Sequence, residues 1–120
     1  MKIAFYAPLK PPSHPVPSGD RRMARLLMRA LGQAGHEVRL ASRLRAYDRS
    51  GSAVTQTRIC KRAEALARRF SERHRPDLWF TYHLYHKAPD WIGPLVAAQL
   101  GIPYVVAEAS FAPKQENGPW

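Results

Sequence analysis

The chain has 120 residues, 45% of them hydrophobic, and this length and composition fit a single domain with a buried core. No run of eighteen apolar residues occurs, so no segment is expected to span a membrane. The apolar run at the amino terminus reaches only about five residues before Pro8, which is too short for a secretory signal peptide. The single cysteine, Cys60, excludes a disulfide within the chain and fits a reducing cytoplasm, and we expect it to be an ordinary helix residue.

Positive charge dominates the chain. Nineteen Lys and Arg residues stand against nine Asp and Glu residues, and fifteen of the basic residues lie between Arg21 and Arg75. Such a distribution indicates an anionic partner, namely phospholipid headgroups, nucleic acid or a phosphorylated substrate, although a solvated arginine-rich surface would look the same. Nucleic acid is the least favoured of these, because the basic segments lack interleaved aromatic residues and any recognised binding motif.

The first forty-two residues predict a βαβ unit. Residues 3–6 form an apolar strand, residues 7–17 a proline-rich loop, and residues 37–42 a second strand. Between them we expect an amphipathic helix over residues 19–34, with Ser18 as its N-cap and Gly35 just past its end. Ligands of such units bind beyond the carboxyl ends of the strands, opposite helix amino termini. The positions of this helix expected to face the sheet follow a 3.6-residue period: Met23, Leu26, Leu27, Ala30, Leu31 and Ala34.

The remaining residues continue the alternation of helix and strand. Residues 43–56 read as a polar connection with at most a short strand, and residues 57–74 as a helix that ends before Pro76. A buried strand over residues 78–83, a short helix over 90–100 and a strand over 104–108 precede a polar tail at 111–120. The predicted fold is therefore α/β: a Rossmann-like three-layer α/β/α domain with about four parallel strands in the order 2-1-3-4. The second helix is expected to bury Ile59, Ala63, Leu66, Ala67 and Phe70.

Five segments, taken in order, carry a resemblance to a known family. They are MKIAFY at residues 1–6, PSGDRR at 17–22, LGQAGHEV at 31–38, RPD at 75–77 before a strand ending in His83, and GIPYVV at 101–106. Together they resemble the amino-terminal half of a GT-B glycosyltransferase of the large retaining family 4, also called group 1. The resemblance covers nearly the whole chain.

The resemblance implies one half of a two-domain enzyme. In that family this half binds mainly the acceptor and faces a second Rossmann-like domain that binds the nucleotide-sugar. The second domain is not among these 120 residues, so we expect a truncated domain that is incomplete for catalysis alone, and whether the chain by itself is an enzyme stays open. The expected co-substrate is a nucleotide-sugar, and the acceptor a glycan or a lipid-linked molecule. The expected location is cytoplasmic, with peripheral contact to an anionic inner membrane face as an option.

The resemblance also implies candidate binding residues, while the catalytic residues stay unknown. The family's glycine-rich loop approaches the donor diphosphate and the sugar, and Ser18 and Gly19 stand in its place, the serine being a departure. His83 resembles the family histidine that hydrogen-bonds the sugar or the acceptor. Glu108 ends the next strand at the same edge, where the family more often has a histidine. An ordinary structural role is the alternative for each, and the weaker candidates for an anionic substrate are Lys10, His14, His86 and Lys87.

Other chemistries find less support in the sequence. No metal or other cofactor is expected, because His83 and His86 lack an acidic partner to complete a ligand set, retaining enzymes of this family need no metal, and no GxGxxG motif is present. The rival function is a non-catalytic Rossmann-like module that binds an anionic ligand or a protein partner, or that dimerises through an exposed sheet edge. For the transferase hypothesis, segments near residues 19, 83 and 108 should converge on one pocket rim.

Overall fold

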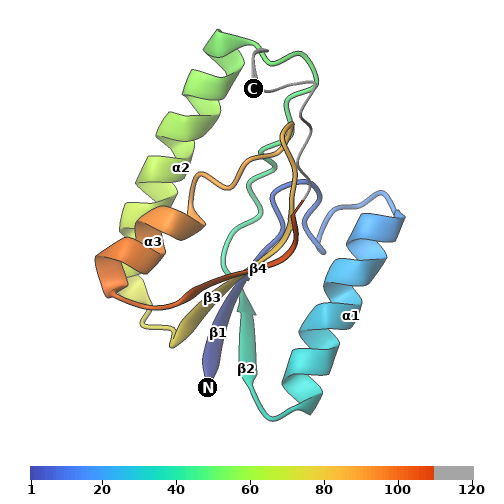
Figure 1. The fold of residues 1–120 in the computed structure, drawn as a ribbon, viewed down its shortest axis with the longest axis vertical. Coiled ribbons are helices and arrows are strands. Elements are labelled where there is room, and N and C mark those ends of the chain that lie inside the picture. The colour runs from blue at the N-terminus through green and yellow to red at the C-terminus, as the bar shows by residue number, and fades with distance from the viewer. Residues whose placement is uncertain (110–120) are drawn as a thin grey trace.

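A computed structural model describes residues 1–109 of the chain. They contain one four-stranded sheet. The strands are β1 (Lys2–Tyr6), β2 (Glu37–Leu40), β3 (Leu78–Leu84) and β4 (Tyr104–Ala109), in the spatial order β2-β1-β3-β4 (Figure 1). Every neighbouring pair is parallel, so the carboxyl ends of all four strands lie at one edge of the sheet. The predicted α/β fold and strand order are confirmed.

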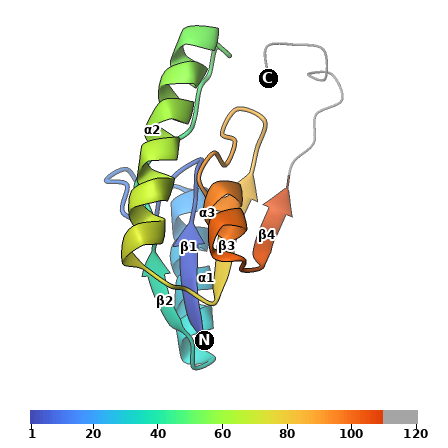
Figure 2. The same ribbon diagram turned by 90° about the vertical axis from the view of Figure 1, so that its left-hand side faces the viewer.

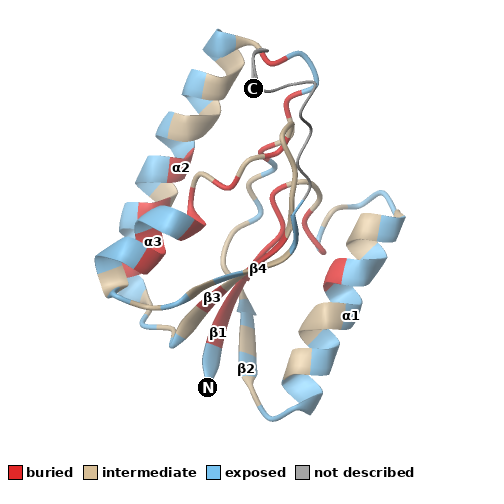
Figure 3. Cartoon of the chain, in the orientation of Figure 1, coloured by how far each residue is buried: buried red, intermediate tan, exposed pale blue. Residues whose placement is uncertain are grey.

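Helices cover both faces of the sheet. Helix α1 (Gly19–Gln33) lies against one face, and α2 (Ala53–Arg73) and α3 (Gly93–Leu100) lie against the other (Figures 1 and 2). Side chains alternate along the central strand β1, so Phe5 packs toward α1 while Ala4 and Tyr6 pack toward α2 and α3. The buried residues accordingly follow the sheet and the helix surfaces that face it (Figure 3).

The largest buried side chains lie on the α2–α3 side of the sheet. Trp79 and Tyr6 are both fully buried there, with ring centroids 6.1 Å apart in an edge-to-face arrangement. The hydroxyl of Tyr6 donates to the carbonyl of Leu44 at 2.8 Å, so the connection that follows β2 is held against the core. Ala63 and Ala67 of α2 are buried in the same cluster, so this side of the helix faces the core.

One buried carboxylate joins three elements on this side. Asp90, 8% exposed, accepts hydrogen bonds from the hydroxyls of Thr81 and Tyr104, each at 2.6 Å. Its other oxygen accepts from the backbone N–H groups of Ile92 at 2.9 Å and Gly93 at 2.8 Å. Asp90 therefore connects β3, β4 and the amino end of α3, and burial together with the Asp90 charge raises the pKa of Tyr104.

The predicted inner face of α1 is only partly right: Leu27 and Leu31 pack against the core as expected, but the face is shifted by about one residue. Met23 and Leu26 are 43% and 44% exposed, and the side facing the sheet is centred on the fully buried Ala24. The small side chain of Ala24 lets the helix sit close to the sheet, and Leu27 and Met28 pack beside it. The helix thus carries two apolar stripes, of which only one is covered within residues 1–109.

Several predicted boundaries also need correction. Helix α2 begins at Ala53 rather than residue 57, because Ser52 accepts from Thr55 N–H and caps the helix earlier than its apolar pattern suggested. Helix α3 begins at Gly93 rather than residue 90, since Asp90 is used as an acceptor for the helix's amino end. Strand β2 ends at Leu40, two residues early, and residues 43–52 contain no strand. The predicted polar tail lies outside the described residues.

Candidate site at the carboxyl edge of the sheet

The amino end of α1 points to the edge where the strands end. Ser18 is its N-cap: the serine Oγ accepts from the backbone N–H of Arg21 at 3.2 Å. Gly19 is the first helical residue and is exposed. A Cβ added at Gly19 would contact nothing within 4 Å, so the fold itself does not require glycine at this position. The space beside Gly19 is therefore open to an incoming molecule.

The end of β3 is bonded to the first turn of α1. The Nδ1 atom of His83 lies 2.9 Å from Oδ1 of Asp20, and the two side chains are 16% and 36% exposed. Because a carboxylate accepts, this contact places the ring hydrogen on Nδ1 and leaves Nε2 of a neutral imidazole free to accept. Sixty-three positions separate the two residues in sequence. The bond brings together two of the three predicted segments.

Tyr82 and Glu108 extend this contact to the end of β4. Tyr82 is 5% exposed, and its burial, followed by the charges of Glu108 and Asp20, raises its pKa to about 12. The Glu108 and Asp20 carboxylates therefore lie close enough to this hydroxyl to act on its ionisation. The segments near residues 19, 83 and 108 therefore meet, and we call Asp20, Tyr82, His83 and Glu108 the edge cluster.

Both strands change backbone conformation inside the edge cluster. His83 and Glu108 have φ angles of 62° and 64°, in the left-handed region that non-glycine residues rarely adopt. The sheet register pairs Tyr82 with Ala107 and Leu84 with Ala109, so the two left-handed residues sit at the same level of neighbouring strands. Strained backbone of this kind gathers at functional sites, where the surrounding structure holds it in place.

The strain at Glu108 can be measured by comparing two truncations. We expect Glu108→Gly to be more stable to unfolding than Glu108→Ala by about 1 kcal/mol, because both lose the carboxylate but only glycine adopts positive φ without strain. Urea denaturation followed by circular dichroism gives both free energies.

The matched control for this comparison is Glu37, an exposed strand residue without positive φ. There the order should reverse, since glycine in a strand is less stable than alanine by about 0.5–1 kcal/mol. Finding alanine the more stable at both positions would contradict strain at Glu108.

Buried tyrosines make stability depend on pH in the alkaline range. Burial raises the pKa of Tyr6 as well as those of Tyr82 and Tyr104. The stabilisation is complete below pH 10, where tyrosine is neutral in both states, and falls as pH rises because the unfolded chain ionises first. For Tyr82 the loss should amount to about 1.4 kcal/mol per pH unit between pH 10 and about 12.

Urea denaturation of the wild type and of Tyr82→Phe at pH 8, 10 and 11 tests this pH dependence. The variant should lose less stability per pH unit above pH 10, because it has no hydroxyl to ionise at this position. An identical slope in the two proteins would show that the Tyr82 hydroxyl is equally acidic in the folded and unfolded states.

The weaker candidates lie in two loops and are not among the edge-cluster contacts. His14, in the β1–α1 loop, stabilises a local turn, because its Nδ1 accepts from the backbone N–H of Val16 at 3.1 Å. Lys10 is half-buried in the same loop. In the β3–α3 loop, His86 lies against the Tyr85 ring with centroids 4.4 Å apart, and the Lys87 carbonyl accepts from the N–H of Asp48.

The sequence interpretation missed two residues of the edge cluster. Asp20 was not among the predicted site residues, and Tyr82 was expected only to be part of a buried strand. The position of Asp20, directly after the Ser-Gly pair, could have indicated a site residue. A side chain in the first turn of α1 lies at the edge of the sheet where β3 ends. Tyr82 offered no such signal, since an aromatic residue in an apolar strand is an ordinary core residue.

No group of three or more His, Cys, Asp or Glu side chains within residues 1–109 is placed to hold a metal ion. None of the helices in that range has both the length and the apolar character needed to cross a bilayer. Cys60 is half-buried in α2, with its Sγ 3.6 Å from Oε1 of Glu64.

Comparison with known proteins does not identify the chain. No protein-family model, no curated protein and no solved structure matches it at a significant level.

Proposed function

We propose that the chain is the acceptor-binding domain of a retaining glycosyltransferase, which transfers a sugar from a nucleotide-sugar to a glycan or a lipid-linked acceptor. The observation that carries the proposal is the His83–Asp20 contact, which joins the end of β3 to the first turn of α1 at the carboxyl edge of the sheet. Ligands of parallel α/β sheets bind at this edge. The motif resemblance supplies the class of reaction.

The edge cluster has the chemistry that a sugar hydroxyl requires. The free Nε2 of His83 accepts or, when protonated, donates a hydrogen bond, and the exposed Glu108 carboxylate accepts one. Asp20 holds the imidazole in one orientation, so its hydrogen bond to a substrate is formed at little entropic cost. In this proposal the cluster orients a substrate hydroxyl, and the nucleotide-sugar is held mainly by another domain.

The amino end of α1 suits the anionic part of the donor. Backbone N–H groups of a helix amino terminus carry partial positive charge, and the open space beside Gly19 lets a phosphate come close to the backbone. Gly19→Ala should leave stability unchanged, because its Cβ has room, yet should weaken donor binding by filling that space. No metal ion is needed in this arrangement, since the helix end and nearby arginines supply the positive charge.

The test is a sugar-transfer assay on the full-length protein, with a panel of labelled nucleotide-sugars and with glycans and glycolipids as acceptors. His83→Gln should lower transfer by about 100-fold, the loss expected when a positioned polar contact to reacting groups is removed. The matched control is His36→Gln, at the opposite end of the sheet, where His36 contacts the chain's amino terminus.

The assay also has clear contrary outcomes. Equal activity in the two histidine variants would remove His83 from the site. Absence of transfer from every donor, together with retained binding of an anionic ligand, would favour the alternative of a non-catalytic module.

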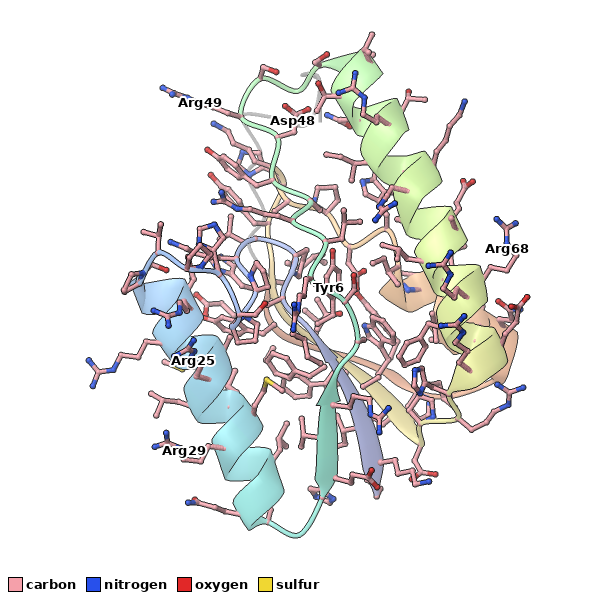
Figure 4. The ribbon with its side chains drawn as sticks, turned by 180° about the vertical axis from the view of Figure 1, so that it is seen from behind. Tyr6, Arg25, Arg29, Asp48, Arg49 and Arg68 are labelled. Carbon is pink, nitrogen blue, oxygen red and sulfur yellow. The ribbon has the colours of Figure 1, made fainter. Side chains whose placement is uncertain are left out.

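The same proposal includes a second partner, an anionic membrane surface contacted by α1. The exposed Met23 and Leu26 lie on α1 beside the exposed Arg22, Arg25 and Arg29, a mixture that suits an anionic lipid surface. The arginines of α2 do not share this surface: Figure 4 shows Arg29 on one side of the molecule and Arg68 on the other. Helix α1 alone is therefore the proposed lipid-facing element.

A further inference from the structure

A hollow beyond the end of β2 has the lining of an anion-binding site. It has a volume of about 630 Å³ and lies between the β2–α2 connection and α2. Leu40, Leu44 and Leu66 give it an apolar wall, and each of them is half-buried. Three arginines complete the lining: Arg43 and Arg45 from the connection and Arg62 from α2.

The positive charge of this hollow is not neutralised within residues 1–109. No Asp or Glu of the described chain lines it. Arg43 and Arg62 are exposed and make no hydrogen bond or ion pair with residues 1–109. Arg45 is held by a 2.8 Å hydrogen bond from its Nε to the carbonyl of Leu9 and lies 5.1 Å from the centroid of the Tyr47 ring. One guanidinium is therefore positioned in advance, and two more are available to a ligand.

We propose that this hollow binds the phosphate of an organic phosphate ester. The guanidinium group is planar and presents parallel N–H donors, which match the oxygen atoms of a phosphate better than any other side chain does. The leucine wall gives the organic part of the ester an apolar surface, so an ester should bind more tightly than inorganic phosphate.

The hollow is distinct from the edge cluster. Strand β1 lies between β2 and β3, so the ends of β2 and β3 are roughly 10 Å apart. The hollow is lined in part by α2, whereas Asp20 of the edge cluster belongs to α1 on the other face of the sheet. The proposal therefore does not depend on sugar transfer, and a phosphate ester could bind in a protein that transfers no sugar.

The test is a calorimetric titration of the chain with phenyl phosphate, with inorganic phosphate as the reference ligand. Arg62→Gln and Arg43→Gln should each weaken the binding of phenyl phosphate by about tenfold, the effect of losing a charge-assisted hydrogen bond. The matched control is Arg68→Gln, which removes the same charge from α2 at a residue that points into solvent (Figure 4). It should change the affinity by less than about twofold, because salt screens a distant exposed charge.

Two further measurements keep the result interpretable. Thermal unfolding should be unchanged in all three variants, since Arg43, Arg62 and Arg68 are exposed and unpaired within the described residues. Displacement of phenyl phosphate by glycerol phosphate would identify a free ester as the source of the phosphate. Displacement by phosphatidate vesicles but not by glycerol phosphate would identify a lipid headgroup. Either result supports the site. Equal weakening by Arg62→Gln and Arg68→Gln, or no binding of phenyl phosphate, would overturn it.

Discussion

Asp90→Ala is expected to lower the free energy of unfolding by about 4 kcal/mol, because it leaves several buried donors without an acceptor at once. The two oxygens of Asp90 accept from the hydroxyls of Thr81 and Tyr104 and from the N–H groups of Ile92 and Gly93. The Thr81 hydroxyl in turn accepts from the indole N–H of Trp79 at 2.8 Å, so the loss reaches into the centre of the core. Urea denaturation measures the change.

Two comparison variants separate the buried network from a generic loss of a carboxylate. Asp90→Asn keeps one acceptor oxygen and should lose only about 2 kcal/mol, since the hydroxyls can reorient toward its amide. Asp77→Ala removes an exposed carboxylate that accepts a single bond, from the N–H of Lys2 at 2.7 Å. It should cost about 1 kcal/mol. Similar losses for Asp77→Ala and Asp90→Ala would contradict the role assigned to the network.

Gly93→Ala is expected to destabilise the protein by about 3 kcal/mol through overpacking. Gly93 is buried at the start of α3, and a Cβ there would clash with Oδ2 of Asp90, Nε1 of Trp79 and Cε2 of Tyr104. All three neighbours belong to the Asp90 network, so none can move without breaking a hydrogen bond or a ring contact.

The control for Gly93 is the same substitution at a glycine with free space around it. Gly32, near the end of α1, has nothing within 4 Å of an added Cβ. Gly32→Ala should raise stability by about 0.5–1 kcal/mol, because alanine favours the helix. A loss below about 1 kcal/mol at Gly93 would show that α3 can shift outward, contrary to the tight packing described above.

The sheet could be predicted from sequence because its strands are short apolar runs bounded by glycine and proline. Residues 3–6 and 104–106 have this form, and parallel βαβ units allow few strand orders. Even so, the prediction of a buried strand at β3 is only partly right. Trp79, Thr81 and Tyr82 are buried, whereas Leu78 and Phe80, on the face where α1 is the only helix described, are half-buried.

The orientation of helices was harder to predict, because α1 has more apolar residues than one face can hold. Its pattern fits two stripes about one residue apart, and only the packing of Ala24 against the sheet distinguishes them. The start of α3 depends in a similar way on contacts that are distant in sequence. Asp90 looks like an ordinary helix-start residue until Thr81 and Tyr104 are placed beside it.

The candidate site was predictable in outline and not in detail. Parallel topology alone brings the amino end of α1 and the ends of β3 and β4 to one edge, so Gly19, His83 and Glu108 could be grouped from sequence. The left-handed backbone at His83 and Glu108 could not, because histidine, although enriched at positive φ, mostly has negative φ, and glutamate is not enriched there. The arginine-lined hollow was equally hidden, since Arg43 and Arg62 come together only when α2 folds back against the end of β2.

The bond between Arg45 and Leu9 connects the hollow to the β1–α1 loop. The same guanidinium lines the hollow and secures the loop that leads to α1. An anion that draws the Arg45 guanidinium toward itself changes the strength of its hydrogen bond to the loop. By thermodynamic reciprocity, a molecule bound at the loop must then change the affinity for the anion by the same factor. A ligand in the hollow and a ligand at the loop would thereby change each other's affinity through the Arg45 side chain.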